Sequence, residues 1–401
     1  MIQKEISLSQ TIDIENLGFD AGAHILVRQG LVNLAKGESL FVVGNQPHWE
    51  VQLAAWCRAQ GHPCEILSSE GRSSKVRVVQ GGADSGRWRD AHKISVDAAE
   101  TAAPQWGLAA RGATVELGTP EIDFRLSHKN EIWAESIDEL YKQALSAQWH
   151  PDEAIDWKAP FNLPDVVENA VVQVMTYMIE NEVAALVVPA RFLGQVHPHY
   201  REVQAILALQ INDEARHIDV FTRRVRLKGK EPLLSTAGGQ ASLKTLLDEN
   251  DFSVSGFLLS VLGEGTFVTL LNFLHNHAPD PVTKQIARLA SKDESRHVAF
   301  GMNHLLWRLE REPEFRTRLA NAVQTRNEAL AATSGLNEEV FDALVILAAG
   351  EFIPGAIAQG YKKVQTLMLD MSEGRRTRLA RLGFDTVTAE KLSALHTRNF
   401  M

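Results

Sequence analysis

A pentapeptide of the form Asp-Glu-x-Arg-His occurs twice in the chain and constrains its fold more than any other feature. The copies span residues 213–217 and 293–297. Side chains three residues apart project from neighbouring turns of an α-helix onto one face. Each copy can therefore bind one metal ion through its glutamate and its histidine. These four candidate ligands are Glu214, His217, Glu294 and His297.

The residues around both copies repeat at the period of an amphipathic helix. One stripe is Val203, Ile206, Leu207, Glu214, His217 and Phe221, and the other is Ile286, Ala290, Glu294, His297, Gly301 and Leu305. A carboxylate on a buried face needs a partner, because leaving its charge unpaired is costly. For a single Glu-x-x-His, a surface pair or a hydrogen-bonded core pair is the simpler interpretation. Two copies on apolar stripes favour a metal.

A bundle that binds two metal ions needs one further glutamate from each of two other helices. Glu264 lies about 30 residues before Glu294, in a segment with almost no other charge. Its stripe is Phe257, Val261, Glu264, Val268 and Leu271. Glu180 and Glu182 precede Glu214 by a similar interval, and Glu182 alone continues the stripe Val171, Met175, Met178, Glu182 and Ala185. We therefore predict Glu182 and Glu264 as the remaining ligands.

Composition excludes several classes of protein. With 401 residues and 45% hydrophobic content, the chain is long enough for a large core, and its formal charge of -9 disfavours nucleic acid as a main partner. We expect a cytoplasmic protein without a membrane partner, because Met1 is followed by no apolar run of secretory length and no stretch has 18 uncharged apolar residues. Cys57 and Cys64 are too few for a disulfide framework and are not spaced as Cys-x-x-Cys, which excludes a rubredoxin-type iron site.

The first 67 residues alternate between strand and helix patterns, whereas residues 126–401 are strongly helical. We expect strands at 11–15, 38–43 and 64–67 and helices at 22–34 and 49–60. The predicted fold class is α+β, with a small two-layer α/β domain of βαββαβ order at 1–67, a linker with short strands at 68–125, and a helical bundle at 126–401. Residues 228–250 are expected to cross between the two helix pairs.

The stretches "LAKGESLFVV" and "WCRAQGHPCEI" give the first domain a resemblance to the TusA-like sulfur-carrier fold. That family carries a Cys-Pro pair at the start of its first helix, and the corresponding stretch here is Phe19 to Gly22. Sulfur transfer needs a thiolate nucleophile. The resemblance therefore implies a degenerate module for interaction or packing, in which Cys57 is buried within the second helix.

The remaining acids and histidines receive other interpretations. His197 and His199 are interpreted as part of a solvated turn rather than a metal site, and His275 and His277 as residues near a helix C-terminus, where cations are favoured. Glu351 is interpreted as an isolated acid that is hydrogen-bonded or near the surface.

The six ligands imply a neutral site rich in oxygen. Four glutamates balance two divalent ions when both histidines are neutral, and this donor set suits iron or manganese better than zinc or copper(I). Helix geometry turns Asp213 and Asp293 away from their adjacent glutamates. We predict that each aspartate accepts from the histidine of the other copy, with Arg216 and Arg296 balancing the charge. A plain interhelical salt-bridge layer is compatible with this arrangement.

The segments "NEVAALVVPARF", "LALQINDEARHIDVF", "GEGTF" and "SKDESRHVAFGM" resemble the ferritin-like di-iron carboxylate superfamily. The chain is most similar to its oxygen-activating branch. The resemblance covers residues from about 129 to at least 310 and implies that Glu182, Glu214, His217, Glu264, Glu294 and His297 ligate a di-iron or Mn/Fe centre. The reductase small subunits in this branch keep a radical tyrosine where this chain has Phe221, and many multicomponent hydroxylases keep a threonine where it has Val268.

These features predict an O2-activating oxidase, hydroxylase or monooxygenase that acts on a small organic substrate. A separate electron donor or reductase is implied, since the chain has no flavin, NAD or iron-sulfur motif. Gly301, Ala185 and Ala290 are expected either to leave room for substrate or O2 or to allow close helix packing. A ferroxidase or iron-storage protein is the main alternative, and a role in sulfur metabolism through the first domain is another. We expect a monomer or homodimer.

Overall fold

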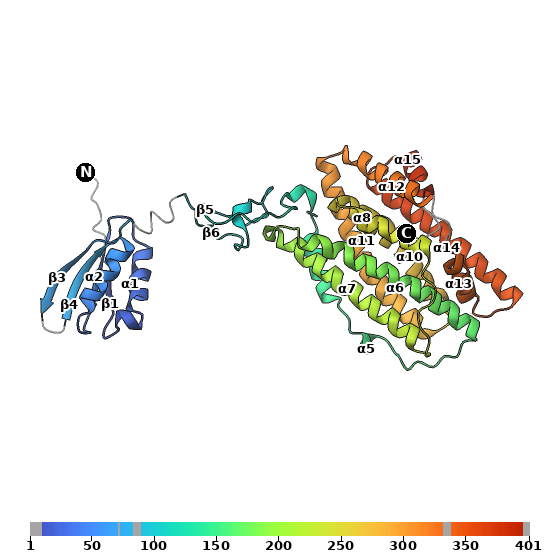
Figure 1. The fold of residues 1–401 in the computed structure, drawn as a ribbon, viewed down its shortest axis with the longest axis horizontal. Coiled ribbons are helices and arrows are strands. Elements are labelled where there is room, and N and C mark those ends of the chain that lie inside the picture. Colours follow the sequence, from blue (N-terminus) through green and yellow to red (C-terminus); the bar gives the residue numbers. More distant parts are fainter. Residues whose placement is uncertain (1–9, 71–72, 83–89, 332–337, 396–401) are drawn as a thin grey trace. The chain divides into compact units, whose positions relative to one another are not determined.

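The computed structural model describes residues 10–70, 73–82, 90–331 and 338–395, and it divides the chain into two compact units. Unit 1 comprises residues 1–96 and 109–121, and unit 2 comprises residues 97–108 and 122–401. The chain combines a small sheet region with a helical bundle, which is the α+β class (Figure 1). Residues 68–125, expected as a linker, are divided between the two units.

Unit 1 contains a four-stranded sheet in the order β1-β2-β4-β3. Its elements are β1 (Thr11–Asp13), α1 (Ala23–Val32), β2 (Ser39–Gly44), α2 (Trp49–Gln60), β3 (Cys64–Glu70) and β4 (Ser73–Val79). Strand β1 pairs parallel with β2, whereas β4 lies antiparallel between β2 and β3. The βαββαβ order predicted from the sequence is therefore wrong, and the observed order is βαβαββ. Only β2 lies between α1 and α2, and the two strands that follow one another directly are β3 and β4, after α2. Strand β4, expected as a short strand of the linker, belongs to this sheet, where its Val76 and Val78 pair with Val42 and Leu40.

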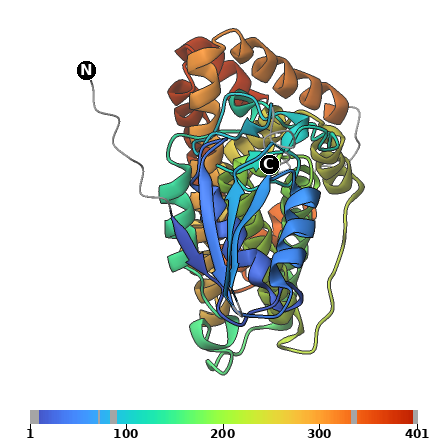
Figure 2. The same ribbon diagram turned by 90° about the vertical axis from the view of Figure 1, so that its left-hand side faces the viewer.

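The sheet of unit 1 buries one face against both helices. Side chains along β2 alternate between half-buried and buried, and its buried members Leu40 and Val42 share one core with Val27 of α1 and Leu53 of α2. Because successive strand residues point to opposite faces, both helices cover the same face of the sheet. Figure 2 shows the strands of this sheet side by side. A second sheet pairs β5 (His92–Lys93) with β6 (Thr114–Val115).

Unit 2 is a helical bundle. Its helices are α4 (Ile137–Ser146), α5 (Pro151–Ala154), α6 (Asp165–Leu193), α7 (Arg201–Arg226), α8 (Ala237–Asp248), α9 (Phe252–Gly256), α10 (Gly265–His277), α11 (Pro281–Arg311), α12 (Phe315–Ala331), α13 (Glu338–Ala349), α14 (Pro354–Arg381) and α15 (Thr386–Ala394). A π-helical segment, η5 (Phe257–Glu264), joins α9 to α10. Helix α6 packs along α7, and α10 packs along α11 (Figure 1).

Local sequence signals place the ends of the central helices. Asp280 caps α11 by accepting the backbone N–H of Thr283, and Pro281 occupies the first helical position, where its missing N–H costs nothing. Helix α6 follows Pro164 and includes Pro189 in its last turns. A proline inside a helix removes one backbone hydrogen bond. Helix α8 lies within residues 228–250, the expected crossing between the helix pairs.

All four apolar stripes that carry the predicted ligands lie in the protein interior, but one of them is not α-helical throughout. Residues 257–264 are buried on every side and form a π-helix rather than the α-helix expected from a 3.6-residue stripe. Val268 is therefore only half-buried. A π-helical turn inserts an extra residue, and such turns occur frequently at functional sites. Here the segment ends at Glu264.

Among the described residues, two single helical stretches of unit 2 are long and apolar enough to cross a membrane by length and composition, and the bent pair Glu338–Ala349 and Pro354–Arg381 would be a third if it counted as one span. The two single stretches are Asp165–Leu193 and Phe252–His277, and 72% and 83% of their most apolar windows are buried inside the protein. Both supply the bundle core, which includes Val171, Met175, Leu270 and Leu271. The high hydropathy of both stretches is therefore explained by their burial in the bundle core.

The turn between α6 and α7 contradicts the prediction of a solvated loop. His197 and His199 are 1% and 3% exposed. The ring of His199 packs 4.7 Å from that of Trp106, and its Nε2 accepts the backbone N–H of Ala99. Both histidines were misassigned because the aromatic residues that cover them lie far away in the sequence.

Candidate metal centre

The six predicted ligands meet in the interior of unit 2. Glu182 comes from α6, Glu214 and His217 from α7, Glu264 from the end of η5, and Glu294 and His297 from α11. None is more than 5% exposed. By contrast, Glu180 is half-buried and Glu351 is exposed, and neither belongs to the cluster.

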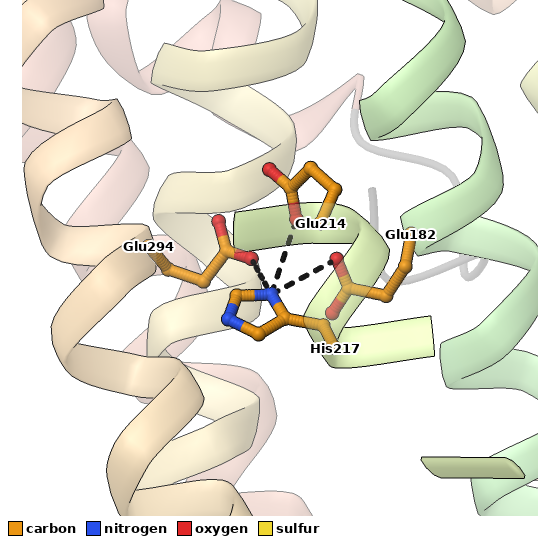
Figure 3. A group of neighbouring side chains, drawn as sticks. All are labelled: Glu182, Glu214, His217 and Glu294. Atoms are coloured by element: carbon orange, nitrogen blue, oxygen red, sulfur yellow. Dashed lines mark hydrogen bonds and ion pairs between the residues drawn. The ribbon is translucent and has the colours of Figure 1, made fainter. Parts of the chain in front are cut away.

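The six side chains form two overlapping groups of metal-binding geometry. The first group is Glu182, Glu214, His217 and Glu294, and the second is Glu214, Glu264, Glu294 and His297. Within each group, one ligand atom per residue lies within 4.8 Å of the others. Figure 3 shows three carboxylates of the first group directed at the ring of His217. Because Glu214 and Glu294 belong to both groups, the cluster is able to bind a pair of metal ions with two shared carboxylates.

Each imidazole presents one ring nitrogen to the cluster and the other to an aspartate. The Nδ1 of His217 lies 3.1 Å from Glu214 and 3.3 Å from Glu294. Its Nε2 lies 3.1 Å from Asp293. An Nε2–H that donates to an aspartate leaves the Nδ1 lone pair free for a metal ion.

The second imidazole repeats this arrangement with the helices exchanged. The Nδ1 of His297 lies 3.0 Å from Glu214, and its Nε2 lies 3.3 Å from Asp213. These are the crosswise pairs expected from helix geometry. Each aspartate therefore fixes the imidazole of the opposite helix.

Two arginines neutralise the aspartates. Arg216 donates to Asp213 at 2.5 Å and to Asp293 at 2.9 Å, and Arg296 also contacts both carboxylates. The predicted salt-bridge layer and the predicted histidine contacts therefore coexist. Two positive and two negative charges cancel in this layer, so it adds no net charge to the six candidate ligands.

Three polar residues near the centre escaped the sequence analysis. Gln148 donates to Asp213 at 2.8 Å, Trp149 donates to Asp293 at 2.7 Å, and Gln210 donates to Glu264 at 3.0 Å. Gln148 and Trp149 follow α4, which packs on α7 and α11. They lie outside any periodic stripe, so no local pattern indicates their role. Gln210 shares the buried face of α7 and precedes Glu214 by one turn, a spacing that could have identified it.

The pKa values in the cluster are displaced in opposite directions. Burial raises the pKa of Glu182 well above 4.5, and the neighbouring Glu294 and Glu214 raise it further. Burial also raises the pKa of Glu264, with Glu294 adding to the effect. Burial disfavours the charge of Glu214 as well, yet the two imidazoles outweigh this effect and lower its pKa. The carboxylates thus repel one another unless cations accompany them.

The carboxylate oxygens of the cluster have free positions that a pair of metal ions would fill. Glu182 Oε1 and Glu264 Oε2 are buried and have no hydrogen-bond partner among the described residues, whereas Glu214 Oε1 and Glu294 Oε1 contact only imidazole Nδ1 atoms of the cluster. Buried polar atoms without partners are rare and costly. These two oxygens, together with Glu214, Glu294 and the two imidazoles, make up the oxygen-rich donor set that iron or manganese ions prefer.

A mostly apolar pocket adjoins the centre. Its lining residues are Val188, Pro189, Phe192, Leu207, Gln210, Phe252, Ser255, Gly256, Leu259, Ser260, Phe300, Gly301 and His304. Gln210 connects this pocket to the centre through its hydrogen bond to Glu264. Gly301 combines both roles considered for it, because an added Cβ would lie 2.9 Å from the Ser260 side chain and the residue also lines the pocket.

Comparisons with known proteins give distant structural likenesses. No family model and no curated protein sequence matches the chain. A Synechococcus protein with aldehyde deformylating oxidase activity is 16% identical, with a TM-score of 0.42 over 57% of this chain and 96% of that one. Two variants of an R2-like ligand-binding oxidase, one with an Mn/Fe and one with an Fe/Fe cofactor, are each 14% identical with TM-scores of 0.43. The former alignment covers 65% of this chain and 94% of that one, and the latter 66% and 95%. These scores do not establish a family for the chain.

Proposed function

We propose that the chain is an O2-dependent oxidase or oxygenase that uses a pair of iron ions, or one manganese and one iron ion, to oxidise a small organic substrate. The observation that carries this proposal is the sharing of Glu214 and Glu294 between two four-residue groups. A pair of ions bound there would supply electrons for the reduction of O2 and a Lewis acid for its binding. The ligands would be Glu182, Glu214, His217, Glu264, Glu294 and His297.

The protein residues around the cluster support a buried, water-poor reaction site. Asp293 and Asp213 hold each Nε2–H, so that both Nδ1 atoms would face bound ions as acceptors. Gln210 orients Glu264 by donating to its Oε1. Near His217 lies the buried ring of Phe221, with 6.4 Å between the ring centres. Because phenylalanine has no hydroxyl group, this position cannot store a tyrosyl radical.

The adjoining pocket is the proposed substrate site. Its walls are mainly aliphatic and aromatic, and polar atoms come from Gln210, Ser255, Ser260 and His304. Burial lowers the pKa of His304 to about 4, so the ring is neutral at pH 7. An apolar pocket with a few polar groups and no charged lining residue suits an uncharged or weakly polar organic molecule. Electrons would come from a separate donor protein.

We infer that unit 1 serves interaction rather than sulfur transfer. The support is the state of its thiols, because Cys57 is fully buried and burial, with Cys64 nearby, raises its pKa to about 12. A thiol with that pKa is protonated at pH 7 and is a poor nucleophile. The position that corresponds to the carrier thiol lies in the stretch from Phe19 to Gly22 and contains no cysteine.

Anaerobic loading with Fe(II), followed by O2, tests the proposed reaction. We expect about two ions per chain, O2 consumption that stays near one per metal pair, and further turnover only with an electron donor and a substrate. A store for iron would instead oxidise many ions per chain and retain them as mineral in a large assembly. Iron titration combined with light scattering separates these results, and tens of ions per subunit in a large shell would overturn the oxidase.

A further inference from the structure

Three arginines of helices α12 and α14 lie close together. Arg326 comes from α12, and Arg375 and Arg378 come from successive turns of α14. Arg375 is 6% exposed. None of the three forms an ion pair with a carboxylate of the described residues, whereas the other buried arginines, Arg224 and Arg308, do so.

The guanidinium groups of Arg375 and Arg378 have unused donors. The buried Nε and Nη1 of Arg375 and the buried Nε and Nη2 of Arg378 have no hydrogen-bond partner within the described parts of the chain. Arg326 is different, because its Nε donates to Thr245 at 2.8 Å and its Nη2 to Ser242 at 2.9 Å. A buried donor without a partner costs free energy, and the cost is larger for a charged group.

Arg326 and Arg375 line a pocket. Its lining residues are Leu258, Leu262, Val323, Arg326, Asn327, Leu330, Arg375, Leu379, Leu392, Ser393 and Leu395. The wall is therefore leucine-rich, with two cationic side chains and no acidic one. Leu258 and Leu262 share one face of η5, whereas Leu259 and Ser260 of the same segment line the pocket beside the metal centre. The two pockets use different faces of η5.

We propose that this second pocket binds an organic anion, with its charged head paired to Arg375 and its apolar body against the leucines. The planar guanidinium fork matches a carboxylate or phosphate oxygen pair. A ligand of this kind would supply the missing acceptors and cover the apolar wall at once. Burial and the charge of Arg378 lower the pKa of Arg375 to about 10, which still leaves it charged at pH 7.

Packing alone does not account for this arrangement. An arginine that serves only to fill space would extend its guanidinium to solvent or pair it with an acid. Arg378 instead lies against the backbone where η5 meets α10, because a Cβ added to Gly265 would lie 2.5 Å from its Cζ. Its charge acts on that of Arg375, so an anion paired with Arg375 in the pocket would also offset the repulsion between the two guanidinium groups.

Calorimetric titration of the full chain with hexanoate tests the proposal. We expect saturable binding of hexanoate and no comparable binding of 1-hexanol, which has the same apolar body without the charge. Arg375→Met should weaken hexanoate binding roughly tenfold or more, since it removes the charged donors. Arg375→Lys should bind with intermediate affinity, because the charge remains without the fork.

Arg376→Met is the matched control, because Arg376 is the next residue on α14 and its side chain is 44% exposed. It should bind hexanoate like the unmodified chain. The comparison of hexanoate with hexanol needs no variant, so a folding defect in Arg375→Met leaves the test intact. Absence of saturable hexanoate binding, or equal binding of hexanol, would overturn the proposal. If inorganic phosphate bound as tightly as hexanoate, the leucines would contribute nothing to binding, and the proposal that the ligand is an organic anion would be overturned.

Discussion

Asp293 Oδ2 and His217 Nε2 lie 3.1 Å apart and join α11 to α7 through the interior of the bundle. The reciprocal contact joins Asp213 to His297. Each Asp-Glu-x-Arg-His copy therefore supplies two candidate ligands to the cluster and an aspartate that orients the imidazole of the other copy. Loss of one aspartate should disturb a histidine on the opposite helix while its own helix keeps its ligands.

The first prediction concerns Asp293→Asn. The amide retains a hydrogen-bond acceptor but loses the charge that stabilises the Nε2–H tautomer and pairs with Arg216. We expect metal affinity to fall by about 10 to 100-fold, as is typical when such partners are removed. Competition with a chelator measures this change. The control is Asp219→Asn on α7, whose side chain is 54% exposed, and equal affinities of the two variants would argue against the orienting role.

The second prediction separates Glu182 from Glu180. Both lie on α6, but Glu182 is 1% exposed and belongs to the first four-residue group, whereas Glu180 is half-buried and does not. Glu182→Gln should lower the metal content from about two ions to about one per chain, because only one group remains complete. Glu180→Gln should leave it unchanged. Elemental analysis after iron reconstitution decides, and a loss only in Glu180→Gln would reverse the assignment.

The third prediction concerns the pH dependence of the metal-free protein. Burial raises the pKa values of Glu182 and Glu264 above 4.5 in the folded state. The pKa values of His217 and His297 are also raised above 6.5, because the contacts to carboxylates outweigh burial. At any pH between the ordinary pKa of one of these groups and its raised pKa, the group binds more protons in the folded state than in the unfolded state. The stability of the folded state must therefore fall as the pH rises.

Metal binding replaces these protons with cations and should remove the trend. We expect the melting temperature of the metal-free bundle to decrease from about pH 5 to pH 8, while that of the iron-loaded protein changes little. Calorimetric scans of both forms across this range make the comparison. A metal-free protein that gains stability toward pH 8 would contradict the assigned pKa directions.

The repeated motif made much of the centre predictable from sequence. Glu214, His217, Glu294 and His297 are separated by a fixed helical spacing, so local geometry alone places each pair on one face. The crosswise aspartates followed from the same geometry. Glu182 could be chosen over Glu180 because a buried stripe contains one residue and excludes the other.

The features that could not be predicted depend on contacts distant in sequence. Trp149 reaches Asp293 across 144 positions, and no pattern near Trp149 indicates this partner. The π-helical turn before Glu264 was missed because the stripe Phe257, Val261 and Glu264 also fits an α-helix, and residues 257–264 are buried on every side, so no exposed face reveals the inserted residue. A short strand was expected near Val76 and Val78, but its Ser- and Gly-rich neighbourhood placed it in the linker rather than in the first sheet, where it pairs with β2.

The fourth prediction concerns the thiols of unit 1. Because burial raises the pKa of Cys57 to about 12, this residue should resist alkylation in the folded protein at pH 7 and react only after unfolding. Cys57→Ser should leave any oxidase activity intact. Mass spectrometry after incubation with a sulfur donor provides a second measurement. A persulfide on Cys57 or Cys64 that turns over with the enzyme would identify unit 1 as a catalytic partner.

The last prediction concerns a buried ion cluster that lies away from the proposed ligands. Arg224 is fully buried and donates to Glu168 at 2.6 Å, to Asp280 at 3.0 Å and to Thr283 at 2.9 Å. It thereby connects α7, α6 and the cap of α11. Arg224→Met leaves two carboxylates without their cation in the interior. We expect the free energy of unfolding to fall by about 3 to 5 kcal/mol, the range for breaking a buried ion pair.

The neighbouring Arg223 gives a matched control, because it pairs with Asp152 and Asp219 at the surface and stacks on Trp157. Arg223→Met should cost far less, since water screens its ion pairs. Denaturant unfolding of the metal-free protein measures both variants without a contribution from bound ions. Metal content should remain about two ions per chain in each variant under native conditions, because neither arginine contacts the cluster. Equal destabilisation by the two substitutions would mean that Arg224 adds no more than a surface pair and that apolar packing alone holds these helix ends together.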